Sequence, residues 1–306
     1  MGKEKIQKGD RKDAYLVRDV DPLHIVMSYI LGNRCENEAV LKEIVDLTEI
    51  EKYVAKKNES NPQYKYTMFH VFCAIIAKII ALRPKMNYFF ANNHLYERKE
   101  ISETFIVKKI LSEEESKEGL AIIKYDKNSE ESPVEQVHSQ LEKIIYTVRV
   151  EDKEDDTSDF LGKLVALPRF ILKPVFNTLI RMNNKGKLPK AMAPLDPYTS
   201  SCFISNVGSI KLTAQYHHLS NWSSNSFFCL IGEKHMHPYF YPDGKYEMKQ
   251  ALEIGITLDE RIADGTYYAK SIRLLRYLVD HPEELDKPLS TEVEFEDYKN
   301  AGGYFV

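Results

Sequence analysis

Residues 259–265, with the sequence DERIADG, join a strand-like segment to a helix-like segment. The preceding residues, 247–258, are rich in apolar and β-branched side chains, which is typical of a strand. In the following residues, 266–279, apolar side chains recur at the spacing of one helix face, and Pro282 lies just beyond them. The sequence therefore predicts a strand that ends at Gly265 and a helix that follows directly.

The composition indicates a soluble globular protein. With 306 residues, of which 43% are hydrophobic, the chain can bury a large core in one generous domain or two small ones. The formal net charge is -4 and the two signs are interspersed, so the sequence has no basic stripe that could neutralise phosphates. We therefore expect small or amphiphilic partners and no nucleic acid.

Neither export nor membrane insertion is expected. The N-terminus is charged and has no apolar stretch of the kind found in signal peptides. The longest apolar run, residues 68–82, contains His70 and Lys78 and is predicted to be a buried core helix without a transmembrane role. Four scattered cysteines without CxxC pairs indicate reduced thiols, a cytoplasmic location and no metal site. They are Cys35, Cys73, Cys202 and Cys229.

Predicted strands and helices are mixed along the whole chain, which favours an α/β or α+β class. Helices are expected at 22–31, from about 48, at 68–82 and at 132–148, and the spacing of Thr48 and Glu51 predicts a capping box at the start of the second. Strands are expected at 37–47, 88–97, 104–111, 119–125, 202–207, 226–232, 236–241 and 247–258. Residues 151–159 and 183–197 are expected to form loops.

Residues 160–182 are strongly apolar, and Pro168 and Pro174 are expected to break them into two short helices. This segment is interpreted as a helical hairpin that closes the core or as a lid over a substrate entrance, and the two interpretations are compatible.

Three segments resemble one family when they are taken together. They are residues 67–90 (TMFHVFCAIIAKIIALRPKMNYFF), 200–210 (SSCFISNVGSI) and 255–285 (GITLDERIADGTYYAKSIRLLRYLVDHPEEL). In this order they are similar to the catalytic domain of dihydrolipoamide acyltransferases, the core subunits of 2-oxoacid dehydrogenase complexes. Chloramphenicol acetyltransferase shares that fold, and DERIADG resembles the HxxxDG motif of the superfamily with Glu260 in place of the histidine.

The resemblance implies an α/β fold, a two-layer chloramphenicol acetyltransferase-like sandwich of a mixed sheet and helices. It also implies a homotrimer or a multiple of trimers, with active sites in channels between subunits. Coenzyme A would enter such a channel from one side and a small-molecule acyl acceptor from the other. The expected organisation is a charged segment at 1–20, an acyltransferase-like domain at 21–290 with a helical insertion at about 157–190, and a tail at 291–306.

The family's functional positions carry over to this chain one by one. Glu260 stands where the motif histidine acts as the general base. Ser205 matches the serine that supports the oxyanion, and Asp264 matches the motif aspartate that holds the loop. Glutamate has a solution pKa of about 4.3, so it removes a proton from a thiol less readily than histidine unless burial raises its pKa.

Two histidines and several structural roles are alternatives at this site. His217 and His218 follow the SNVG segment, and either could supply an imidazole. Glu260 could instead pair with Arg261, or with a remote arginine such as Arg18 or Arg34. Ser205 could hydrogen-bond a neighbouring strand, and Asp264 with Gly265 could form an ordinary helix cap.

The sequence contains no lipoyl domain, no subunit-binding domain and no Ala/Pro-rich linker, so we expect no covalent lipoyl group. It favours a stand-alone acyltransferase that moves an acyl group between a coenzyme A thioester and a small thiol, hydroxyl or amine. The alternative is a catalytically degenerate relative that binds acyl thioesters or acts as an oligomeric assembly protein.

Overall fold

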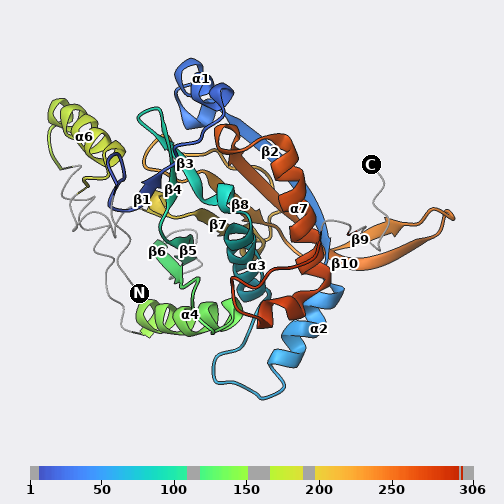
Figure 1. Cartoon of the computed structure of the whole chain (residues 1–306). Helices are drawn as coiled ribbons and strands as arrows, with labels where there is room; N and C mark the ends of the chain where they lie inside the picture. Colours follow the sequence, from blue (N-terminus) through green and yellow to red (C-terminus); the bar gives the residue numbers. More distant parts are fainter. Residues whose placement is uncertain (1–6, 109–117, 151–165, 189–196, 296–297, 299–306) are drawn as a thin grey trace.

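The computed structural model describes residues 7–108, 118–150, 166–188, 197–295 and residue 298. Its main sheet has seven strands, with six in the order β2-β10-β8-β7-β5-β6 and β9 paired with β10 (Figure 1). The strands are β2 Glu38–Asp46, β5 Ile101–Lys108, β6 Glu118–Tyr125, β7 Cys202–Asn206, β8 Phe227–Ile231, β9 His235–Phe240 and β10 Tyr246–Asp259. The pairs β5–β7 and β7–β8 are parallel and the others are antiparallel, so the sheet is mixed as predicted.

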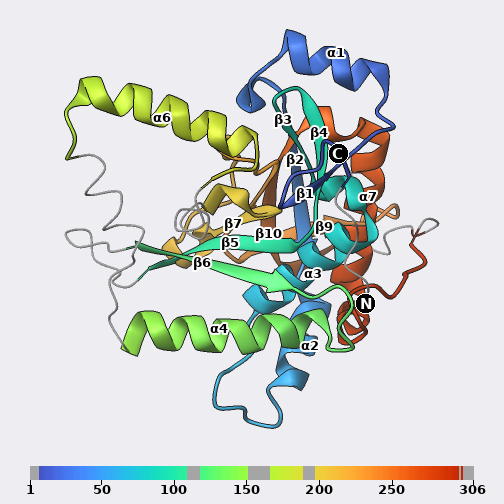
Figure 2. The same cartoon turned by 60° about the vertical axis from the view of Figure 1, so that its left-hand side comes forward.

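One face of this sheet is covered by a layer of helices (Figures 1 and 2). They are α2 Thr48–Lys57, α3 Met68–Leu82, α4 Pro133–Val150 and α7 Gly265–Asp280. Helix α3 is apolar on almost every side, and its residues 70–81 are all buried, because it lies between the sheet and the other helices. The two-layer α/β architecture is therefore confirmed.

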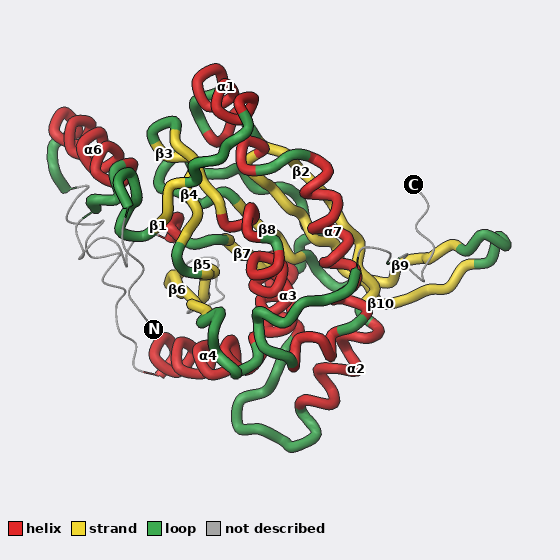
Figure 3. The backbone as a smooth tube through the Cα atoms, viewed as in Figure 1, coloured by secondary structure: helices red, strands yellow, loops and turns green. Residues whose placement is uncertain are grey.

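The remaining elements lie at the edges of this sandwich. One end is bordered by helix α1 (Pro22–Ile30) and by a small sheet of β1 (Ala14–Leu16), β4 (His94–Arg98) and β3 (Tyr88–Ala91). Helix α6 (Arg169–Asn184) lies to one side, and the β9–β10 hairpin projects away from the body (Figures 1 and 3). No helix in the described ranges is long and apolar enough to span a membrane.

Residues 211–220 cross the second face of the main sheet over β8 and β10. Two glycines allow this segment to approach the strands closely. A Cβ at Gly255 on β10 would lie 1.9 Å from the carbonyl oxygen of Gln215, and one at Gly232 would lie 2.6 Å from the Ala214 nitrogen. The absence of a side chain at both positions therefore fixes where the segment that carries His217 crosses the sheet.

Several local predictions were wrong. Pro174 does not break the helix, because α6 continues through it from Arg169 to Asn184. Thr48 does not form a capping box: Leu47 is the N-cap of α2, and the Thr48 hydroxyl donates to Asp46 instead. The strand predicted at 88–97 is a hairpin, since Asn92 and Asn93 both adopt positive φ and form a tight turn.

Other predictions were confirmed, and some concern residues outside the described ranges. The helices at 22–31, 68–82 and 132–148 and the strands at 37–47, 119–125, 202–207, 226–232, 236–241 and 247–258 form within a few residues of their predicted bounds. The acidic segment 151–159 and the first part of the apolar run at 160–182 lie outside the described residues. The four cysteines are free thiols, and Cys35 is the exposed one.

A carboxyl group is buried between the sheet and α3. Glu103 on β5 is fully buried; its Oε2 accepts a hydrogen bond of 2.7 Å from the Tyr125 hydroxyl, and the Cys73 thiol on α3 is its other polar neighbour. Burial raises the pKa of Glu103 well above its ordinary value of 4.5. A carboxyl group whose pKa is higher in the folded than in the unfolded state stabilises the fold most at pH values below its unfolded pKa. This stabilisation is lost as the pH rises from the unfolded towards the folded pKa.

We therefore expect Glu103→Gln to flatten the pH dependence of stability. Between pH 5 and pH 8, the free energy of unfolding of the variant should fall less than that of the wild type, by at least about 1.4 kcal/mol, the equivalent of one pKa unit. Urea unfolding at both pH values measures this difference. Glu59→Gln, at an exposed glutamate, is the control and should follow the wild type; identical pH profiles for all three proteins would contradict the assignment.

Candidate functional site

The DERIADG segment forms the turn between β10 and α7. Strand β10 ends at Asp259, residues Glu260–Ile262 form a short 3₁₀ turn, and α7 begins at Gly265. The prediction that Gly265 ends the strand was wrong, because β10 ends six residues earlier, at Asp259, and Gly265 is already helical. The segment thus places consecutive side chains in very different surroundings.

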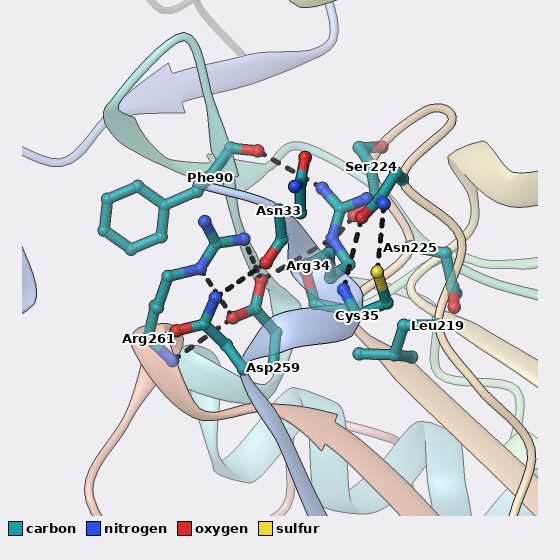
Figure 4. Close-up of polar contacts among 12 residues, drawn as sticks. Asn33, Arg34, Cys35, Phe90, Leu219, Ser224, Asn225, Asp259 and Arg261 are labelled. Atoms are coloured by element: carbon teal, nitrogen blue, oxygen red, sulfur yellow. Dashed lines mark hydrogen bonds and ion pairs between the residues drawn. The ribbon is translucent and has the colours of Figure 1, made fainter. Parts of the chain in front are cut away.

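Asp259 is fully buried between two arginines (Figure 4). Arg261 donates to it through two hydrogen bonds of 2.8 Å, from Nε to Oδ1 and from an Nη to Oδ2. The Nε of Arg34 lies 3.5 Å from Oδ2 on the other side. The planar guanidinium of Arg261 matches the two carboxylate oxygens, which makes this a strong charge-assisted contact.

Arg34 and Arg261 use their remaining donors to hold loops around the end of β10. Arg34 donates to the carbonyl oxygens of Ser220, Ser223 and Phe90 at 2.7, 3.2 and 3.2 Å. Burial lowers the pKa of the Arg34 guanidinium, and the neighbouring Asp259 carboxylate opposes that effect. The group stays a cation at any ordinary pH.

Arg261 also joins the turn to helix α1. It donates to the carbonyl oxygens of Leu31 and Gly32, at 3.2 and 3.1 Å, and its own carbonyl accepts a hydrogen bond of 2.7 Å from His24 Nδ1. This network was missed at the level of sequence. Asp259 and Arg261 flank Glu260 in the DERIADG segment, but nothing in their spacing shows that the distant Arg34 also pairs with Asp259.

Glu260 is exposed, and its side chain has no hydrogen bond or ion pair within the described part of the chain. Its backbone N–H donates to the Asn37 carbonyl at 2.8 Å, which fixes the main chain. The arginines considered as its partners are engaged elsewhere: Arg261 and Arg34 with Asp259, and Arg18 with Asp10. The Glu260 carboxylate is therefore held only by its backbone and is open to solvent or to a second molecule.

Asp264 forms the N-cap of α7, as one of the structural alternatives predicted. Its side chain accepts a hydrogen bond of 2.8 Å from the Tyr267 N–H. This backbone hydrogen bond lowers the pKa of Asp264 below its usual 3.8, so the carboxylate is charged at neutral pH. The charge also complements the helix dipole at this end.

Ser205 lies near the C-terminal end of β7, opposite Leu230 on β8. It is half-buried, and its hydroxyl has no hydrogen-bond partner among the described residues. The alternative prediction, a hydrogen bond from the Ser205 side chain to a neighbouring strand, is not found among the described residues. Its hydroxyl is available to a ligand.

His217 lies on the same face of the sheet as Ser205. Its ring stacks on Phe228, with centroids 4.1 Å apart, and Phe228 stacks in turn on Phe203 at 4.9 Å. Because side chains alternate along a strand, Phe203 and Ser205 point to the same face of β7. The Nδ1–H of His217 donates to the His218 carbonyl at 2.7 Å, which leaves Nε2 as the acceptor, whereas His218 is exposed.

Strand register separates Ser205 from Glu260 within one chain. Ser205 is opposite Leu230, and Leu230 is opposite Gly255 on β10. Glu260 follows Gly255 by five residues, which corresponds to roughly 15 Å along the strand direction. The two residues therefore lie towards opposite ends of the sheet, and a single chain does not bring them into one site. No cluster of three or more potential metal ligands occurs in the described ranges.

Sequence comparisons identify no relatives: no protein-family model matches the chain, and neither does any curated protein. Solved structures do resemble it. A probable dihydrolipoamide acetyltransferase from Listeria monocytogenes superposes with a TM-score of 0.54 at 14% identity, over 92% of this chain and 97% of the other. The cubic core of a pyruvate dehydrogenase multienzyme complex gives 0.54 at 13% identity, over 88% and 93%.

A third structure is the dihydrolipoamide acetyltransferase of Azotobacter vinelandii, with a TM-score of 0.55 at 15% identity over 88% of this chain and 93% of the other. The chain has the fold of these catalytic cores. The fold expected from the three resembling segments is thereby confirmed. For the Azotobacter enzyme, a serine, a histidine and an asparagine have been studied in the catalytic mechanism. At this level of identity, the acetyltransferase fold alone is shared.

We expect Asp259→Asn to destabilise the acetyltransferase fold strongly. The substitution leaves two buried guanidinium groups without a counter-charge, which costs about 3–5 kcal/mol in comparable buried pairs. Urea unfolding measures the loss, and Asp243→Asn, in the exposed β9–β10 turn, is the matched control. A loss below about 1 kcal/mol would show that the buried ion pair is not what holds this region.

Asp264→Ala should have a smaller effect, a loss of about 1 kcal/mol in unfolding free energy, because it removes one helix-capping hydrogen bond. Asp264→Ser retains a capping oxygen and should recover most of the loss. If both variants are as stable as the wild type, the cap contributes nothing and Asp264 is free for another role.

Proposed function

We propose that the protein is an acyltransferase that moves an acyl group between a coenzyme A thioester and a small acceptor with a thiol, hydroxyl or amine group. The observation that carries the proposal is the Ser205 hydroxyl, which is half-buried near the end of a central strand and unpartnered among the described residues. A donor fixed in this way can bind an oxyanion as it forms, without having to break an existing hydrogen bond.

The reaction needs a base as well as this donor. The acceptor attacks the thioester carbonyl and gives up its proton to the base; Ser205 stabilises the resulting oxyanion. When the carbon–sulfur bond breaks, the coenzyme A thiolate leaves and takes up the proton. The acyl group ends on the acceptor, and no oxidation or reduction occurs.

Glu260 and His217 compete for the role of base. His217 supports a site within one chain, since it shares a sheet face with Ser205 and presents Nε2 as an acceptor. Glu260 supports a site between two chains, because register keeps it away from its own Ser205. An exposed carboxylate with no partner in its own chain is free to reach into a neighbouring subunit.

Exposed apolar side chains next to the motif favour the arrangement between chains. Helix α1 contacts the Glu260–Ile262 turn through the His24–Arg261 hydrogen bond, and it exposes Leu23, Tyr29 and Ile30 at 64%, 68% and 72%. Large apolar residues gathered in this way are typical of protein interfaces. We infer a homotrimer whose subunits meet beside Glu260, with the acyl-transfer site in the boundary.

The proposal is tested by thiol release from acetyl-CoA in the presence of a small thiol acceptor. Ser205→Ala should lower turnover by about 10²-fold, as the loss of one oxyanion donor does elsewhere. Loss of the base should lower turnover by about 10²-fold or more, and we expect this loss in one of the two variants Glu260→Gln and His217→Gln. Ser209→Ala, just beyond the same strand, is the control. Tight binding of acetyl-CoA without turnover would instead support the catalytically degenerate alternative.

Mixing two inactive variants distinguishes the two bases. If Glu260 acts across a subunit boundary, co-assembled Ser205→Ala and Glu260→Gln chains contain some sites with both residues intact, and part of the activity returns. If His217 acts within one chain, mixing Ser205→Ala with His217→Gln restores nothing. Light scattering of the wild type gives the subunit number, and a monomer would contradict the proposal of a shared site.

A further inference from the structure

A cavity of about 190 Å³ opens beside the buried Asp259 network, away from Ser205. The turn at Asn92–Asn93, the end of α6 and the loop at Asn221–Ser223 form its walls, and Arg34 and Arg261 line it as well. Its walls therefore come from five separate parts of the chain. A surface assembled in this way depends on the tertiary structure and is not a chance gap along one loop.

The charges around the cavity do not balance. Two guanidinium groups line it, and the single carboxylate between them is Asp259. None of the lining residues that the structure describes is acidic. The exposed Glu36 binds Asn33 nearby, but it does not line the cavity and water screens its charge. Two guanidinium groups and one carboxylate leave a net charge of +1 at the cavity, although the guanidinium nitrogens already donate to Asp259 or to backbone carbonyls.

A further buried arginine lies in this region without lining the cavity. Arg98 is buried and donates to the carbonyl oxygens of Asn87 and Thr199. Burial, and next to it the charge of Arg34, lowers the pKa of Arg98 to about 9. The Asp13 carboxylate opposes this shift, so the repulsion between Arg98 and Arg34 is partly compensated within the chain.

Several polar groups at the cavity lack partners. The Ser223 hydroxyl is buried, with 8% of the residue exposed, and makes no hydrogen bond. The side-chain amides of Asn92, Asn93 and Asn184 have no hydrogen-bond partner among the described residues. A buried hydroxyl left without a partner is costly and is found where a ligand or water supplies the missing contact.

We propose that this cavity binds a small oxyanion, either a carboxylate or a phosphate, with the Asn amides contacting its polar substituents. Guanidinium and amide groups are the ones that proteins use for such anions. The volume is below that of a drug-sized site and corresponds to roughly six water molecules, so the ligand has few heavy atoms. This inference does not depend on acyl transfer, because Ser205, His217 and the Glu260 carboxylate take no part in it.

The test titrates the wild-type protein with sodium lactate, with inorganic phosphate and with lactamide, at matched ionic strength, by calorimetry and by thermal unfolding. Lactate and lactamide have nearly the same shape and differ in charge. We expect saturable binding and a raised melting temperature for at least one of the two anions, and neither effect for lactamide. Comparison of lactate with phosphate identifies the anionic group.

An isosteric charge change on α6 locates the site. Asn184→Asp adds a carboxylate at the cavity wall and should weaken anion binding by about tenfold or more. Asn177→Asp adds the same charge two turns earlier on an exposed part of the helix and should leave binding unchanged. Asn92→Asp is a second cavity variant, since aspartate tolerates the positive φ of that turn.

Three results would overturn the proposal. They are the absence of saturable binding by both anions, equal binding of lactamide, and an equal effect of Asn184→Asp and Asn177→Asp on anion binding. A circular dichroism spectrum like that of the wild type shows that each variant is folded.

Discussion

The buried carboxylate of Asp259 organises one end of the molecule. It ends the central strand β10 and anchors Arg261 and Arg34, whose other donors hold α1, the β3–β4 hairpin and the loop around Ser223. An unpaired charge in this position would be very unfavourable, so the carboxylate and the two guanidinium groups must be buried together. The surrounding loops therefore adopt the conformation that satisfies those groups, and this conformation defines both the Glu260 turn and the neighbouring cavity.

The same arrangement separates structural from chemical roles in the DERIADG segment. Asp259 and Arg261 face inward and hold the turn, and Asp264 caps the next helix. Glu260 lies between them and points to solvent, where no described residue restrains its side chain. A functional group kept free on a rigid turn is suited to act on a molecule or subunit outside its own chain. In the proposed acyltransferase, the half-buried Ser205, at the other end of the sheet, would be the complementary part of such a site.

Much of the fold was predictable because its signals are local. Residues 68–82 are apolar apart from His70 and Lys78, and the run 247–258 has a strand composition, so both elements formed nearly where they were expected. The failures were also local but depended on competing interactions. Thr48 bonds to Asp46 rather than to the helix, and Pro174 is accommodated in α6, because proline removes one donor without preventing the remaining helical hydrogen bonds.

The sequence by itself determined the order of most elements, the mixture of strands and helices and the strand position of Ser205, because propensity and periodicity act over a few residues. The two-layer fold was expected from the resemblance of three segments. Only the tertiary structure decided which groups meet. Arg34 reaches Asp259 across more than two hundred residues, His217 stacks on the Ser205 face because Gly255 lets its segment approach, and Ser205 and Glu260 are kept apart by strand register. Such contacts follow from packing and charge burial between distant segments, which no local pattern encodes.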